Sequence, residues 1–153
     1  MSNNFKLEKR EETVSLVMVD GTVIDGRVYL SQYAMHHSGE QTVLDVLIGK
    51  NLFLPMHSNN EFLLVQKNMI SYLRCEVHLA VEFEYTERNV KISFPGNENL
   101  QGTLKMDLPE DRARLTDYIN DGNDYFPLFT GENSYLVNRN LIRDIVLLAD
   151  SSR

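Results

Sequence analysis

The sequence predicts a mainly β protein made of two tandem copies of a small barrel, each with one short helix, joined by a long strand. Three observations lead to this fold class. Two long stretches match each other in order, short alternating strands fill both of them, and Asp-Gly and Asn-rich turns separate the strands. The 153 residues suit two such copies, because a small barrel needs only about 70 residues.

The internal repeat is clearest in residues 45–73, which match a second stretch that lies 72 residues later without any insertion. Upstream of residue 42 the spacing becomes 76. Two unrelated β-rich segments could agree by chance, since short strands share one pattern, but duplication explains the common order and spacing better. The aligned pairs include Asp45–Asp117, Pro55–Pro127, Asn68–Asn140, Ile70–Ile142, Val14–Val90 and Gly26–Gly102.

Each copy is expected to begin with two strands joined by a tight turn. Residues 14–19 are mostly β-branched and apolar, Asp20-Gly21 signals a hairpin, and residues 22–30 alternate between apolar and polar. Gly26 lies in the middle of the second strand, as Gly102 does in the other copy. A glycine inside a strand is typical of a sharp bend or a bulge.

A loop and a short helix are expected next. The loop covers residues 31–40, where the first copy is about four residues longer than the second. Residues 113–120 follow acidic residues and end before Asp-Gly, as helices do, whereas the matching residues 43–49 are rich in β-branched residues and fit a helix or a strand. Asp45 and Asp117 occupy equivalent places, which predicts a capping or turn role for both.

Three short strands are expected to close each copy. Residues 52–56 and 125–129 carry one proline each, which indicates an edge strand or a bulge. The remaining strands are expected over residues 62–66 and 69–73 in the first copy, and over residues 135–138 and 141–148 in the second.

Residues 75–86 alternate strictly between two series, one apolar and one largely acidic, which predicts a strand with one wet face. This stretch contains no Gly, Pro or Ser, so it should join the two copies rigidly. The predicted organisation is a polar N-terminal tail over residues 1–12, a first barrel over 13–74, a connecting strand over 75–88 and a second barrel over 89–150.

The charge, the number of cysteines and the length of the apolar runs exclude or disfavour several classes of protein. The chain has 15 Lys and Arg against 22 Asp and Glu, and the net charge of −7 disfavours nucleic acid as a partner. The single cysteine excludes an intrachain disulfide and a zinc site built on cysteines. No apolar run is long enough to span a membrane and no signal peptide is evident, so we expect a cytoplasmic protein without a membrane partner.

Chemistry-bearing motifs are missing from the sequence. The histidines, His36, His37, His57 and His78, lack the spacing of metal ligands, and no phosphate-binding or nucleophile motif occurs. Cys75 lies on the apolar side of its strand, which favours a buried and inert thiol. We therefore expect a protein that is not an enzyme and needs neither metal nor cofactor.

The order of elements in each copy resembles the Sm-like family of strongly bent small barrels. The closing segment of the first copy, with Lys67 and Asn68, is similar to the second motif of the bacterial Sm-like RNA chaperones. In the second copy, Arg139 and Asn140 are similar to the Arg-Gly form of that motif in archaeal and eukaryotic Sm proteins. The resemblance implies RNA or anion contact at these four residues.

The chain also departs from this family. Its helix follows the second strand instead of preceding the first, and Asn68 and Asn140 stand where family members have His and Gly. The same order of elements also resembles an uncharacterised bacterial domain family that has an Sm-like barrel and no established activity.

Two functions remain open at this point. The preferred one is a non-enzymatic protein that binds a protein partner or itself through the open strand edges of small barrels. The alternative is an Sm-like RNA-binding protein that uses Lys67 and Arg139, although a polar turn between short strands is the simpler interpretation of both residues.

Overall fold

The computed structural model describes residues 9–31, 41–77, 85–106 and 112–148. Within these residues, ten strands form one antiparallel sheet in the spatial order β10-β6-β7-β8-β9-β5-β1-β2-β3-β4. Two short α-helices accompany the sheet. The prediction of a mainly β chain with one short helix in each half is confirmed.

The two halves of the chain repeat one order of elements. The first half contains β1 (Lys9–Met18), β2 (Val23–Ser31), α2 (Val43–Leu47), β3 (Phe53–Ser58), β4 (Glu61–Gln66), the 3-10 turn η1 (Lys67–Met69) and β5 (Ile70–Arg74). The second half contains β6 (Thr86–Ser93), β7 (Asn99–Met106), α3 (Arg112–Asn120), β8 (Tyr125–Thr130), β9 (Asn133–Asn138), the 3-10 turn η2 (Arg139–Leu141) and β10 (Asp144–Leu147).

The pairing of the strands repeats as well. The shifts of 76 residues for the first two strands and 72 for the later ones convert the register of the first half into that of the second. The two halves are therefore equivalent in strand pairing. Equivalent pairs are Val14–Gly26 and Val90–Gly102, Leu16–Leu73 and Ile92–Ile145, and Pro55–Leu64 and Pro127–Leu136.

Several predicted segments begin or end at other residues in the structure. The first strand begins at Lys9 and takes in the last four residues of the predicted tail. Residues 75–77 and 85 of the predicted connecting strand lie outside any strand, and its last three residues belong to β6. The rest of that stretch, residues 78–84, lies outside the described residues, as do residues 32–40 of the predicted loop.

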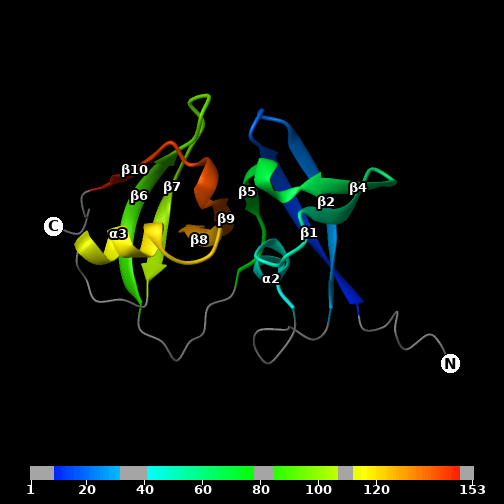
Figure 1. Ribbon diagram of the computed structural model, residues 1–153, viewed down its shortest axis with the longest axis horizontal. Helices are drawn as coiled ribbons and strands as arrows, with labels where there is room; N and C mark the ends of the chain where they lie inside the picture. Colours follow the sequence, from blue (N-terminus) through cyan, green and yellow to red (C-terminus); the bar gives the residue numbers. More distant parts are fainter. Residues whose placement is uncertain (1–8, 32–40, 78–84, 107–111, 149–153) are drawn as a thin grey trace.

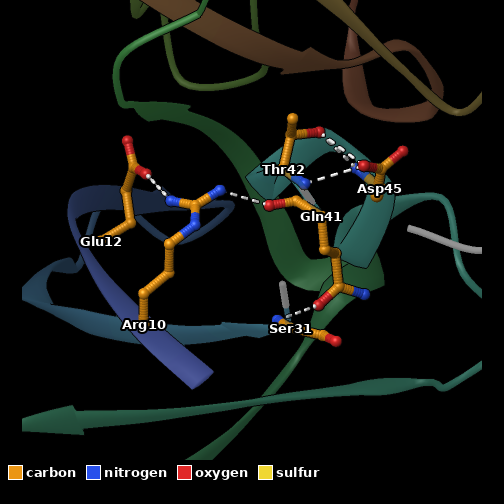
Figure 2. Close-up of polar contacts among 6 residues, drawn as sticks. All are labelled: Arg10, Glu12, Ser31, Gln41, Thr42 and Asp45. Carbon is orange, nitrogen blue, oxygen red and sulfur yellow. Dashed lines mark hydrogen bonds and ion pairs between the residues drawn. The ribbon is translucent and has the colours of Figure 1, made fainter. Parts of the chain in front are cut away.

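The start of α2 is fixed by polar contacts with β1 and β2 (Figure 2). The Gln41 side-chain oxygen accepts a hydrogen bond from Ser31 N at 2.8 Å, and Arg10 Nη2 donates to the Gln41 carbonyl at 2.6 Å. Thr42 Oγ1 accepts from Asp45 N at 3.2 Å, while Thr42 N donates to Asp45 Oδ2 at 2.7 Å. These reciprocal bonds form a capping box, which explains a helix in this β-branched stretch.

The capping role predicted for Asp45 is therefore confirmed, but the same role for Asp117 is wrong. The second helix starts at Arg112, three residues before the position that matches the start of α2. Asp117 consequently lies inside α3, where its carbonyl accepts a hydrogen bond from Asp121 N at 2.8 Å.

For the proline strands the prediction was an edge strand or a bulge, and the edge position is wrong. Pro55 lies in β3 and Pro127 in β8, and both strands have neighbours on each side. The ladder between β2 and β3 ends at the pair Val28–Met56, directly before Pro55 would be paired. The missing N–H of this proline therefore breaks no bond to β2.

Two apolar clusters form the core, and they interlock where β5 meets β9, at the centre of Figure 1. The cluster of the first half includes Tyr125 and Leu136 from the second half. The cluster of the second half includes Tyr72 from the first. The halves thus share core side chains in both directions, so each stabilises the other.

Gly26 and Gly102 mark where the next strand crosses closely over β2 and β7. A Cβ on Gly26 would overlap the backbone carbonyl oxygen of His57 and lie 2.6 Å from Met56 Cε. A Cβ on Gly102 would lie 2.6 Å from the carbonyl oxygen of Phe129. The mid-strand glycines predicted to mark a bend are therefore required by this close crossing.

We expect Gly26→Ala to lower the free energy of unfolding by about 1–3 kcal/mol, because the added methyl group has no room beside a backbone oxygen. Urea unfolding followed by circular dichroism measures the change. Gly131→Ala is the matched control, since nothing lies within 4 Å of its Cβ position. Equal midpoints for the two variants would contradict the steric explanation.

Candidate functional site

Within the described residues, two strands of the sheet, β4 at one end and β10 at the other, have a neighbour on one side only. They lie on opposite sides of the molecule in Figure 1. The outer N–H and C=O groups of an edge strand are available to another strand, so such edges are sites of assembly.

Large apolar side chains are exposed beside these edges. Phe62 and Leu64 of β4 are 59% and 61% exposed, and Val146 of β10 is 44% exposed. The large apolar residues exposed in the described part of the chain also include Val23, which belongs to β2, a strand with a neighbour on each side. The others are Leu52, Phe53, Met69 and Leu147.

An apolar depression of about 430 Å³ accompanies the β4 edge. Met18 and Ile24 form part of its wall, together with Phe53, Leu64 and Met69. A patch of this kind is typical of a surface that another protein covers.

At the junction between β5 and β9, two strands of the same chain pair the backbone N–H and C=O groups that an open edge leaves unpaired. Tyr72 pairs with Val137, Leu73 with Leu136 and Arg74 with Tyr135. Just beyond β5, Cys75 N donates to the Ser134 carbonyl at 3.2 Å, and Ser134 Oγ donates back to the Cys75 carbonyl at 2.6 Å.

Buried side chains complete this junction. The Tyr125 hydroxyl donates to the Lys67 carbonyl at 2.6 Å, and Asn138 Nδ2 donates to the Ile70 carbonyl at 3.0 Å. Burial raises the pKa of Tyr125 above its usual range, so this hydroxyl stays protonated and able to donate.

The basic residues predicted to contact RNA or an anion bind backbone carbonyls near the ends of the helices. Lys67 is buried, and its Nζ donates to the Val46 carbonyl at 2.5 Å. Arg139 donates through Nη1 to the Ile119 carbonyl at 3.1 Å and through Nη2 to the Gly122 carbonyl at 2.7 Å. A cation at a helix C-terminus is favoured by the helix dipole and by the unpaired carbonyls there.

The neighbouring asparagines are more exposed. Asn68 lies on the surface, and Asn140 donates through Nδ2 to Asp124 Oδ1 at 3.1 Å. The side chains of Lys67 and Arg139 each bind carbonyls of their own half, and no hydrogen bond among the described residues joins the two predicted pairs. Their contact with RNA or an anion stays a prediction.

No group of three or more potential metal ligands occurs among the described residues. Of the histidines, His57 is the one that the structure describes. Its Nδ1 shares a hydrogen bond with the Tyr29 hydroxyl, and its ring lies 5.3 Å from that of Phe62. His36, His37 and His78 lie outside the described residues.

Comparisons with protein-family models, with curated proteins and with solved structures found no match to this chain. Among the described residues, no helix has the length and apolar character needed to cross a bilayer.

The sequence reasoning predicted open edges but did not single out their residues. A signal was present, because residues 62–65 are four consecutive apolar residues in a strand that is expected to alternate. A strand that is apolar on both faces is typical of a fully covered position. At the edge of the sheet, this pattern leaves apolar side chains exposed.

We expect Lys67→Met to lower the free energy of unfolding by about 1–2 kcal/mol, because it removes a charge-assisted hydrogen bond from a buried position. Chemical unfolding measures the loss. Lys50→Met is the control, since Lys50 is exposed. An unchanged midpoint for Lys67→Met would show that the carbonyl contact contributes nothing.

Cys75 should be unreactive in the folded chain. Burial, helped by the Glu12 and Glu76 carboxylates, raises the pKa of its thiol to about 12. Only the thiolate reacts, so at pH 8 a disulfide reagent should modify the folded chain about a thousandfold more slowly than the chain in urea. Equal rates in the two states would contradict the buried position.

Proposed function

We propose that this chain is a non-enzymatic protein that acts by assembling with protein chains, other copies included, through the open edges of its sheet. The observation that carries the proposal is the position of exposed apolar side chains at both edges, with Phe62 and Leu64 on one and Val146 and Leu147 on the other. Monomeric soluble proteins usually blunt such edges with charges, prolines or bulges.

The fold behind this function is proposed to be a pair of Sm-like units. The repeated order of five strands in each half, the close crossing at Gly26 and Gly102 and the 3-10 turn before the last strand support this assignment. A cytoplasmic location fits the sequence and is part of the same proposal.

RNA binding through the basic residues is the alternative, and no contact in the structure favours it. Lys67 is 5% exposed and its ammonium group bonds a carbonyl of α2. Nη1 and Nη2 of Arg139 each donate to a carbonyl at or just beyond the end of α3. The net charge of −7 also opposes a polyanion.

The test is the mass of the chain in solution. We expect sedimentation velocity to give a mass above the 17.7 kDa of one chain, and a rise of mass with concentration. Leu64→Lys should return the mass to that of one chain, because a lysine on an edge strand opposes pairing.

Val23→Lys is the matched control, because Val23 is similarly exposed but belongs to β2, which has a neighbour on each side. It should leave the mass unchanged. A strict monomer that enriches no partner in pull-downs would overturn the proposal.

A further inference from the structure

A cavity of about 340 Å³ lies over a row of side chains that crosses the second half of the sheet. Asn89 of β6 pairs with Thr103 of β7, and Thr103 pairs with Phe129 of β8. Leu148, directly after β10, extends the row, because its N–H donates to the Asn89 carbonyl at 2.8 Å. Residues opposite each other on antiparallel strands share one face of the sheet, so these four side chains line the cavity together.

The described lining of this cavity carries no charge, although 24% of the residues in the chain are charged. The first half has the matching row of positions, with the same strand pairing. An uncharged surface at this place is therefore a property of the second half and not of the fold. The first half has Arg27 in place of Thr103, His57 in place of Phe129, Asp25 in place of Gln101 and Glu76 in place of Leu148.

The polar side chains of the cavity retain hydrogen-bonding groups for a ligand. Thr103 Oγ1 donates to Asn89 Oδ1 at 2.8 Å, which fixes the Asn89 amide. Within the described residues, no hydrogen bond occupies Asn89 Nδ2 or the side-chain amide of Gln101. An amide donates through its nitrogen and accepts through its oxygen, and a hydroxyl does both. These groups suit a ligand whose own polar groups both donate and accept, as alcohols do.

Phe129 supplies an apolar wall beside these polar groups. Its ring lines this cavity and a neighbouring depression, and Lys105 Nζ lies 4.9 Å from the ring centre. Lys105 lines the neighbouring depression and not this cavity. The face of an aromatic ring is electron-rich and attracts C–H groups, and Leu148 adds further apolar surface. The cavity thus fits a molecule with hydroxyls on its rim and C–H groups on its faces.

We propose that this cavity binds a neutral hexose ring, either as a free sugar or as part of a glycoside. The volume suits one small ring, because ligand cavities range upward from about 300 Å³. A charged ligand would find no partner of opposite charge in the described lining, and an unpaired charge is costly to bury. The site is independent of the assembly proposed above, because it needs no contact between chains.

Titration of the full chain, followed by NMR of its backbone amides, tests the site. The probes are the methyl glycosides of glucose, galactose and mannose. At least one of them should shift the signals of Gly102, Thr103 and Gly131 to saturation, with a dissociation constant in the millimolar range. The signals of Gly26 and Arg27, at the matching positions of the first half, should not move. Glucuronate and glucosamine, which carry a charge on a similar ring, should bind more weakly.

Two substitutions test the parts of the cavity separately. Phe129→Leu removes the aromatic face and Gln101→Leu removes an amide, and each should weaken binding about three- to tenfold. Gln101 is exposed, so Gln101→Leu should keep the fold even if Phe129→Leu disturbs it. Phe53→Leu is the matched control and should leave the affinity unchanged, because Phe53 belongs to the first half and does not line the cavity.

Adenosine and uridine are included because a nucleobase also combines a ring face with donors and acceptors. The proposal is overturned if none of the three glycosides gives a saturable shift, or if the first half responds as the second does. Tighter binding of a nucleoside or of a charged sugar than of every neutral glycoside would overturn it too, as would an unchanged affinity in Gln101→Leu together with Phe129→Leu. None of these results bears on the assembly function, which sedimentation tests separately.

Discussion

The hydrogen-bonded pairing of β5 with β9 is the interaction on which the rest of the molecule depends. It joins two five-stranded halves into one sheet and places Tyr72 in the core of one half and Leu136 in the core of the other. Each half is small for an independent core, because a domain of this size buries a limited share of its surface. The shared side chains offset this shortage, and the buried bonds of Tyr125 and Asn138 fix the register in which the sharing occurs.

Much of the fold was predictable from the sequence, because several of its residues are ones that the local backbone geometry requires. Gly26 and Gly102 have no room for a side chain, and Thr42 with Asp45 caps a helix in a stretch that composition alone left undecided. The pairing of β5 with β9 was not predictable, since alternation shows which face of a strand is apolar and not which strand lies beside it. The start of α3 was predicted to within one residue, but the repeat wrongly suggested that Asp117 plays the part of Asp45, because α3 begins earlier than the position that matches the start of α2.

The basic residues show why a site is harder to predict than a fold. Lys67 and Arg139 stand at matching positions, and a linear sequence does not tell whether matched charges face solvent or the protein. In the structure both side chains turn inward to the carbonyls of α2 and α3, so their recurrence is explained by helix stabilisation. The contacts within one chain do not explain why several apolar side chains, Phe62 and Leu64 above all, are exposed. In the sequence these residues were noticeable only because one short strand is apolar on both faces.

Hydrogen bonds between Ser31 and Gln41 make the geometry of the sheet independent of the length of the connection between β2 and α2. Their two hydrogen bonds bring the ends of residues 32–40 together, while residues 107–111 make the matching connection between β7 and α3 with fewer residues. The strand registers are nevertheless the same in both halves. Because the entropic cost of a loop grows by only about 0.6 kcal/mol per doubling of its length, this position can accept a spliced-in peptide or an inherited insertion while every strand stays in place.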